Sequence, residues 1–177
     1  MNFNATFPEE KKLDERDGRY LRKAIVWSHA ARRRGNQPYG SVIVSAGNEV
    51  LAEAYNNIAE TGDLTGHAEL NAIRSLAGRG VSREDLAAAT IYASGEPCVM
   101  CAGAIFWSGI GRVVYGLDVA RMQKYRGDGA EVRGNAVTCR DVFRASPHAI
   151  ECIGPALIHD AGAAHEGAPG SASDPAP

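Results

Sequence analysis

The sequence lacks any apolar run that approaches the ~18 residues needed to span a membrane. Residues 1–19 are too charged and too poor in apolar side chains to act as a secretory signal peptide. Neither sign of charge dominates, because 19 Lys and Arg residues stand against 21 Asp and Glu residues and leave a net charge of −2. A balanced charge disfavours a general nucleic-acid binder and a protein of anionic lipid surfaces. We therefore expect a cytoplasmic protein with no membrane partner.

Cysteine is scarce, with four residues in a chain of 177. In a reducing compartment, so few cysteines are typical of metal ligands or buried thiols rather than of a disulfide framework. Cys98 and Cys101 are spaced as C-x-x-C, which makes them candidate metal ligands. Cys139 and Cys152 are too far apart in the chain for a second such motif, and we predict that they are structural thiols.

Length and composition indicate a single domain, because 177 residues with 45% hydrophobic side chains can bury one core. Residues 1–16 are polar and charged with little periodicity, which predicts a flexible N-terminal lead-in whose end can join the first helix. The predicted domain covers residues 17–166. From Ala161 to Pro177, 14 of 17 residues are Ala, Gly, Pro or Ser, so we expect residues 167–177 to be a disordered tail.

Hydrophobic periodicity predicts alternating helices and strands, and hence an α/β protein. Helices are expected at 19–34, 67–76, 98–108, 138–145 and 155–164, and strands at 41–46, 49–55, 90–94, 112–117 and 149–153. The connections 56–66, 77–88 and 118–131 are expected to be loops. About 30 residues with a helix among them separate the last two strands, which favours a parallel crossover over a hairpin.

One group of residues has the composition of a catalytic metal site. His67 and Glu69 begin one predicted helix, and Cys98 and Cys101 begin another. An imidazole and two thiolates suit Zn²⁺, and three protein ligands leave a fourth position open for water. Glu69 follows the histidine by two residues, so it can act as a proton carrier without being a ligand. The alternatives are a closed zinc site, for which no fourth ligand is evident, and a redox pair, which needs neither His67 nor Glu69.

The sequences H-A-E at 67–69 and P-C-V-M-C at 97–101 resemble the H-x-E…P-C-x-x-C signature of zinc-dependent nucleobase deaminases. The likeness spans residues 20–154 and is typical of the cytidine deaminase-like superfamily. It implies a three-layer α/β/α sandwich with a five-stranded mixed sheet, in which strands four and five are parallel. It also implies hydrolytic release of ammonia, a homodimer, and one zinc ion per subunit held by His67, Cys98 and Cys101, with Glu69 as the catalytic residue.

Shorter strings resemble the guanine and tRNA adenosine deaminases rather than the small cytidine deaminases. They are P-Y-G at 38–40, Asn56, E-P-C-V-M-C-A-G-A-I at 96–105 and F-W at 106–107. From this resemblance we expect Asn56 to hydrogen-bond the base, with an Asx turn as its alternative role. Further predicted substrate-binding residues are Tyr39, Ser94, Glu96 and Trp107. Core or dimer packing is the alternative role for Trp107.

Two absences favour a small aminated purine over a tRNA substrate. No Lys or Arg follows Arg144, whereas the tRNA enzymes carry a basic C-terminal helix for RNA. The glycine- and alanine-rich loop that those enzymes place after the fourth strand is also missing here. We therefore predict a deaminase that converts guanine to xanthine. The alternatives are a tRNA adenosine deaminase, a deaminase of a guanosine, pterin or aminotriazine, and a non-catalytic zinc module.

The C-terminal part of the sequence does not show which residues close the pocket. The last aromatic residue is Phe143, whereas some guanine deaminases close the pocket with aromatic residues near the C-terminus, so a different lid or none is expected. Asp128 and Asp160 are candidates for reading ring N–H groups, with solvated surface acids as the alternative. The remaining histidines show no ligand spacing, and His165 falls in the expected tail region.

Overall fold

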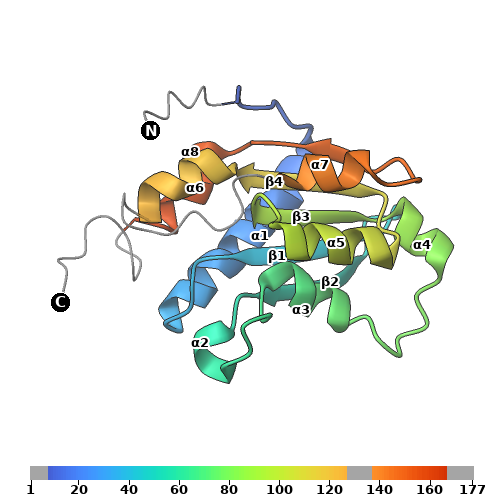
Figure 1. Cartoon of the computed structure of the whole chain (residues 1–177), viewed down its shortest axis with the longest axis horizontal. Coiled ribbons are helices and arrows are strands. Elements are labelled where there is room, and N and C mark those ends of the chain that lie inside the picture. The colour runs from blue at the N-terminus through green and yellow to red at the C-terminus, as the bar shows by residue number, and fades with distance from the viewer. Residues whose placement is uncertain (1–7, 127–136, 167–177) are drawn as a thin grey trace.

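Five strands form one mixed sheet in the order β2-β1-β3-β4-β5 (Figure 1). They are β1 (Gly40–Val44), β2 (Val50–Tyr55), β3 (Thr90–Gly95), β4 (Arg112–Leu117) and β5 (Glu151–Ile153). In this computed structural model, which describes residues 8–126 and 137–166, β1 runs antiparallel to β2 and β3. β3, β4 and β5 are parallel to one another. The predicted α/β class, mixed sheet and parallel fourth and fifth strands are confirmed.

Helices cover both faces of the sheet, which gives the predicted three layers (Figure 1). α1 (Glu15–Arg33), α6 (Val119–Arg126) and α8 (Ile158–Ala163) cover one face, and α3 (Ala68–Arg74), α5 (Val99–Ser108) and α7 (Cys139–Arg144) cover the other. Neighbouring residues of a strand point to opposite faces, so Val42 joins the core beneath α1 and Ile43 joins the core beneath α3. Among the described residues, no helix is long and apolar enough to cross a membrane.

The central strands position the candidate site. β1 and β3 are buried along their whole length, as expected of strands that are covered on both faces. β3 leads into α5, and the carboxyl ends of the parallel strands β3 and β4 meet at one edge of the sheet. In open α/β sheets, ligands bind outside the carboxyl ends of the strands. The residues expected to hold zinc are therefore placed where the fold provides a binding edge.

The first helix starts earlier than predicted, and part of the expected flexible lead-in belongs to the fold. α1 begins at Glu15 rather than at Arg19, because the Asp14 side chain accepts a hydrogen bond from the Asp17 backbone N–H at 2.7 Å. Before this cap, the backbone N–H of Lys11 donates to the Pro155 carbonyl oxygen at 2.7 Å. The end of the predicted lead-in therefore joins the first helix, whereas residues 1–7 and the tail at 167–177 lie outside the described part.

Three connections that were predicted to be loops contain short helices. α2 (Ile58–Thr61) lies in 56–66, α4 (Arg83–Ala88) in 77–88 and α6 in 118–131. α4 has a capping box, in which Ser82 and Asp85 satisfy each other's backbone N–H groups. Polar segments of this length show little hydrophobic periodicity, so the sequence pattern does not reveal these short helices.

A buried ionic network ties α1 to the sheet. The Asp17 carboxylate accepts hydrogen bonds from Arg112 at 2.7 and 2.6 Å and from the Tyr92 hydroxyl at 2.8 Å, and its side chain is 4% exposed. Burial disfavours the charged carboxylate, but the hydrogen bonds from Arg112 and Tyr92 prevail and lower the pKa of Asp17. The ionised form is therefore the one that stabilises the fold.

Replacing Asp17 with Asn is expected to lower the free energy of unfolding by about 3 kcal/mol at neutral pH, because Arg112 loses its buried counter-charge. The folded-state pKa of Asp17 is depressed, so its contribution is complete above the unfolded value of about 3.9 and is lost as the pH falls through the folded value. Urea unfolding at neutral and acid pH measures both effects. Glu151→Gln, which removes the exposed partner of Arg112, serves as the control and should cost less than about 1 kcal/mol. Equal losses in both variants would contradict the assignment.

Candidate metal and catalytic site

Three metal-ligating side chains meet at the starts of α3 and α5. His67 is the N-cap residue of α3, Cys98 is the N-cap residue of α5, and Cys101 lies in the first turn of α5. The Nδ1 atom of His67 lies 3.6 Å from the Cys98 sulfur and 3.5 Å from the Cys101 sulfur. The ligand atoms of the three residues all lie within 4.8 Å of one another. The structure thus brings together the three ligands predicted from the sequence.

These distances fit a zinc ion. Zinc binds a histidine nitrogen at about 2.0–2.1 Å and a cysteine sulfur at about 2.3 Å, and a tetrahedral angle between these bonds places the two ligand atoms about 3.6 Å apart. Both nitrogen-to-sulfur distances of the cluster agree with this value. One imidazole and two thiolates are also a donor set that zinc prefers. The residues therefore fit a three-ligand zinc site with an open fourth position.

The two cysteines differ in how readily they ionise. Hydrogen bonding with Cys101, together with His67, outweighs burial and lowers the pKa of the Cys98 thiol to about 4. The same hydrogen bond raises the pKa of Cys101, which is fully buried. Cys98 is therefore a thiolate at neutral pH, which is the form that binds a metal ion.

Glu69 lies beside the three ligands. It sits in the first turn of α3, is 7% exposed, and its Oε2 atom is 3.5 Å from the Cys101 sulfur. Burial raises the pKa of this carboxyl. A raised pKa is typical of a carboxylate that takes up and returns a proton near neutral pH. The position agrees with its predicted role as a proton carrier next to the metal.

The loop before α3 is fastened at several points that the sequence did not reveal. Asn71 in α3 donates from its side-chain nitrogen to the Tyr55 carbonyl, the Asn57 side chain and the Gly66 carbonyl, at 2.9–3.2 Å. A Cβ atom at Gly66 would lie 2.4 Å from the Asn57 side-chain oxygen and 3.0 Å from the Asp63 carbonyl oxygen, so a larger residue directly before His67 would displace Asn57. Asn71 thereby positions the chain that carries the histidine ligand.

Asn56 is buried at the end of β2, next to Tyr39. Its backbone N–H donates to the Tyr39 carbonyl at 2.9 Å, and its side-chain oxygen accepts from the Ile58 N–H at 3.3 Å. The Asx turn considered from the sequence is therefore present. Within the described residues, the carboxamide nitrogen of Asn56 has no hydrogen-bond acceptor, so the turn leaves this donor available for a base.

Ser94 and Glu96, which were predicted to line the pocket, have partners within the protein. The Ser94 hydroxyl accepts from the Gly40 N–H at 3.0 Å and links β3 to β1. One oxygen of Glu96 accepts from the Val119 N–H at 3.1 Å, and the other lies 3.5 Å from the Cys139 sulfur. Both side chains are buried, and these contacts indicate that they shape the strand end that precedes Cys98.

Trp107 and Asp160 lie on the surface. Trp107 follows Cys98 by nine residues, about 13 Å along a helix axis, and its residue is 81% exposed. The indole therefore lies on the surface, and core packing is excluded for it. Asp160 in α8 is half exposed and pairs with Arg22 of α1 at 3.9 Å. Asp128 lies outside the described residues.

Three aromatic rings from distant parts of the chain pack together. His165 is 4% exposed, and its ring centroid lies 5.2 Å from that of Tyr39 and 5.4 Å from that of Tyr125. Tyr39 in turn contacts the backbone at Gly95, where a side chain would lie 3.2 Å from the tyrosine ring. The expectation that His165 belongs to the tail is therefore wrong, because its ring packs between two tyrosines that the chain places far from it in sequence.

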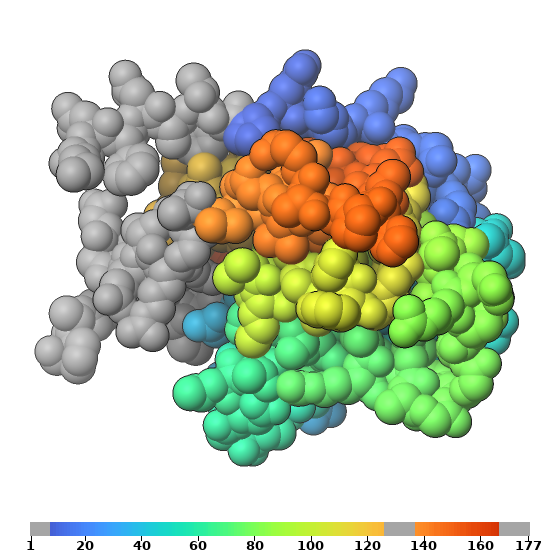
Figure 2. All heavy atoms as spheres, turned by 45° about the vertical axis from the view of Figure 1, so that its right-hand side comes forward, coloured from blue at the N-terminus to red at the C-terminus, as the bar shows by residue number. Residues whose placement is uncertain are grey.

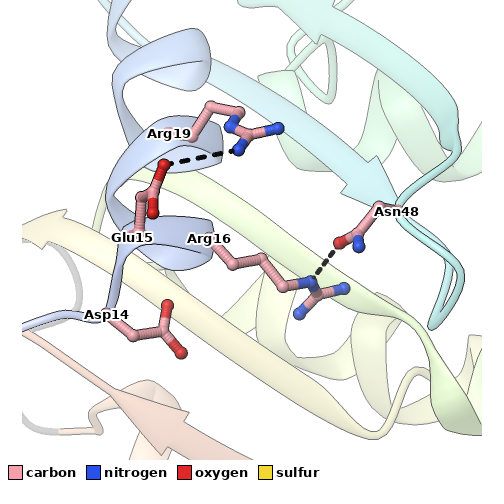
Figure 3. Close-up of a pocket in the computed structure, with 5 residues that line it drawn as sticks. All are labelled: Asp14, Glu15, Arg16, Arg19 and Asn48. Atoms are coloured by element: carbon pink, nitrogen blue, oxygen red, sulfur yellow. Dashed lines mark hydrogen bonds and ion pairs between the residues drawn. The ribbon is translucent and has the colours of Figure 1, made fainter.

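A hollow at the start of α1 is unrelated to the metal cluster. Its volume is about 330 Å³, and Asp14, Glu15, Arg16, Arg19 and Asn48 line it (Figure 3). Arg16 donates to the Asn48 side chain at 2.6 Å, and Glu15 pairs with Arg19 at 3.8 Å (Figure 3). These polar groups satisfy one another, and no predicted site residue is among them.

Comparison with known proteins agrees with this geometry. The family model for the cytidine and deoxycytidylate deaminase zinc-binding region matches residues 14–117, which include Glu69 and all three metal ligands. A probable cytosine deaminase of Schizosaccharomyces pombe is 39% identical over 156 residues, which make up 88% of this chain and 94% of that protein.

Two solved structures share the fold. A tRNA A34 deaminase, studied for A-to-I editing at the wobble position, has a TM-score of 0.66 and 28% identity, and the match covers 83% of this chain and 99% of that chain. Guanine deaminase from Bacillus subtilis has a TM-score of 0.53 and 29% identity, with 68% and 82% covered. Together with the metal cluster, these findings show that the chain belongs to the cytidine and deoxycytidylate deaminase zinc-binding family and is a zinc-dependent hydrolytic deaminase.

Proposed function

We propose that this enzyme deaminates a free aminated nucleobase, with guanine as the first candidate and xanthine as the product. The observation that carries the proposal is the buried Glu69 carboxyl beside the cluster of His67, Cys98 and Cys101. The available Asn56 nitrogen adds a donor for a base. The strings around Tyr39 and Asn56 resemble those of the guanine and tRNA adenosine deaminases, which supports a purine.

Glu69 carries the protons in the proposed reaction. Zinc, when bound, supplies an activated water as the nucleophile for the ring carbon that bears the amino group. The Glu69 carboxylate takes a proton from that water and donates it to a ring nitrogen of the base. A second proton passes through Glu69 to the amino nitrogen, whose bond to the ring then breaks. One water is consumed and one ammonia is released, so the products from guanine are xanthine and ammonia.

Charges near the site support a small substrate rather than a tRNA. Arg34 pairs with Glu60 at 3.6 Å, and Arg74 pairs with Asp63 at 3.2 Å, so two cations near the loop before His67 are already neutralised. Phosphate binding needs cations that can release counterions from the nucleic acid. The absence of Lys and Arg after Arg144 adds to this argument.

Cytosine is the second candidate substrate. The S. pombe relative named a probable cytosine deaminase matches this chain over nearly its whole length, whereas the guanine deaminase structure matches 68% of the chain. Both bases present an amino group on a ring carbon next to a ring nitrogen, and the same groups around Glu69 can act on either. The size of the pocket must then select between them.

Ammonia release from zinc-loaded protein tests the proposal. The panel contains guanine, cytosine, adenine, guanosine, a pterin, an aminotriazine and a tRNA with adenosine at the wobble position, and the Glu69→Ala variant provides the blank. Turnover of guanine above all others is the expected result. Preference for cytosine would replace the first candidate by the second. Turnover of the tRNA alone, with a steep fall as salt increases, would overturn the proposal of a free base.

Asn56 offers a test of base recognition. Asn56→Asp keeps the oxygen that forms the Asx turn but replaces the nitrogen donor, so kcat/KM for the preferred base is expected to fall about 10- to 100-fold. The melting temperature should stay near that of the wild type because the turn persists. Steady-state kinetics and thermal unfolding measure the two effects. An Asp variant with unchanged kcat/KM would assign Asn56 to the turn alone.

A homodimer through α5 is part of the proposal. Figure 2 shows α5 (yellow-green to yellow) at the surface beside α7 (orange). α5 exposes Val99 and Trp107, and the Trp107 ring packs edge-on against Phe106 at 5.2 Å. An exposed tryptophan on an apolar helix is typical of an interface anchor.

Trp107→Glu is expected to weaken dimerisation about 30-fold or more, because a charge would replace the anchor. Sedimentation velocity over a range of protein concentrations measures the change. Val26→Glu, which alters an exposed apolar residue of α1, is the matched control and should leave the dimer intact. A wild-type protein that stays monomeric at high concentration would contradict the proposed dimer.

A further inference from the structure

Two thiols outside the metal cluster lie in contact. Cys139, the first residue of α7, is fully buried, and Cys152 in β5 is partly exposed. Their sulfur atoms are 3.7 Å apart, and both cysteines are free thiols. A disulfide bond of about 2.05 Å could form between them after the sulfur atoms approach by less than about 2 Å. Neither residue takes part in the proposed deamination.

Cys152 can be reached from solvent. It lines a hollow of about 360 Å³ together with Lys11, Tyr115 and Arg140, whereas Cys139 is not part of the lining. The Arg140 guanidinium donates to the Cys152 carbonyl at 2.7 Å and to the Gly154 carbonyl at 2.9 Å, which holds this cation against the strand. A small oxidant can therefore meet Cys152 first, in a hollow whose charged lining residues are Lys11, Arg140 and Glu9.

The surroundings also make the two thiols unequal. The hydrogen bond with Cys139, aided by the charge of Arg140, lowers the pKa of Cys152 despite burial and the nearby Glu96. The same bond and burial raise the pKa of Cys139, whose thiol donates to the Glu96 carboxylate at 3.5 Å. A thiolate is the reactive form toward peroxides, so Cys152 suits the attacking role and Cys139 the second one.

We propose that Cys152 and Cys139 form a peroxide-oxidation site, in which Cys152 is oxidised first and Cys139 then closes a disulfide. The Cys152 thiolate attacks one oxygen of hydrogen peroxide, and the O–O bond breaks. The departing hydroxide takes up the proton that the thiol had released, so that water leaves and a sulfenic acid remains. The Cys139 sulfur attacks the sulfenic sulfur, the S–S bond forms, and the S–O bond breaks. The leaving hydroxide takes the Cys139 proton as a second water. The two thiols lose two electrons, and the peroxide gains them.

Peptide mapping of the zinc-loaded wild-type chain tests the disulfide directly. After peroxide treatment and alkylation of the remaining thiols, trypsin without reductant separates Cys139, in peptide 134–140, from Cys152, in the peptide that starts at residue 145. We expect these peptides to be recovered linked, with the loss of two hydrogens, and separated again by a reductant. Cys98 and Cys101 lie in the same tryptic peptide, 84–112. A disulfide between them would therefore not link two peptides, which distinguishes it from the Cys139–Cys152 bond. Recovery of Cys139 and Cys152 as alkylated thiols would overturn the proposal.

Single variants test the order of the two steps. Cys139→Ser removes the second thiol, so the sulfenic acid on Cys152 should persist and be trapped by dimedone at several times the level of the wild type. Cys152→Ser leaves only the buried thiol and should give no adduct on Cys139. Equal dimedone labelling of the two variants, or labelling of Cys139 alone, would contradict the assigned roles. The wild-type peptide map remains decisive if a variant fails to fold.

Discussion

Replacing Glu69 with Gln is expected to slow ammonia release from the preferred substrate by about 10³-fold or more, while zinc content stays at one ion per chain. Gln has nearly the same size and still fits the buried position in the first turn of α3. It cannot take up and return a proton, and it lies beside the ligands rather than among them. Steady-state kinetics with zinc analysis by mass spectrometry measures both properties.

Glu60→Gln is the matched control for this experiment. Glu60 lies in the same stretch of chain before α3, and its carboxylate pairs with Arg34 and accepts from the Tyr55 hydroxyl. This change should leave kcat within a few-fold of the wild type, because surface pairs contribute little. A Glu69→Gln enzyme that retains a tenth or more of wild-type turnover with full zinc would remove Glu69 from the catalytic step.

Replacing Cys101 with Ser is expected to weaken zinc binding by at least about 10²-fold and to abolish turnover at limiting zinc. A three-ligand site loses one of its two thiolates, and the neutral hydroxyl is a poor zinc ligand. Cys101 is fully buried, so no solvent-exposed group can replace it. Competition with a chromophoric chelator measures the affinity.

Cys139→Ser provides the comparison for that prediction. Cys139 is equally buried but lies outside the cluster of metal ligands, so under reducing conditions its variant should bind zinc as the wild type does. Loss of zinc from the Cys139 variant as well would show that unfolding, rather than loss of a ligand, releases the metal. Unchanged affinity in the Cys101 variant would exclude this residue from the site.

The candidate site illustrates which features a sequence can predict. Two short motifs near helix starts carry the site, namely His67 with Glu69 and Cys98 with Cys101. Metal chemistry restricts the residue types that can occupy such positions. The distances between their ligand atoms then agree with the prediction. Asn56 was also predicted to bind the base. Only the structure shows that its side-chain oxygen forms an Asx turn, while its side-chain nitrogen has no acceptor among the described residues.

Other features depend on contacts between distant parts of the chain. His165 packs against Tyr39 and Tyr125, and its neighbours in sequence carry no apolar pattern that would indicate burial. Trp107 was predicted either to contact the base or to pack in the core or a dimer, and only the structure shows that its side chain is exposed on α5. The position of a side chain around and along a helix is set when the helix packs, which a motif does not reveal.

By itself, the sequence determined the α/β class, the five strands and the zinc ligands, because hydrophobic periodicity and ligand chemistry act over short stretches of chain. Only the tertiary structure decided that the chain at Lys11 meets Pro155, that Asn71 fastens the loop before His67, and that Cys139 meets Cys152. Each of these depends on which surfaces are brought together when helices cover both faces of the sheet. Burial and contact are properties of that packing, so no local pattern of residues encodes them.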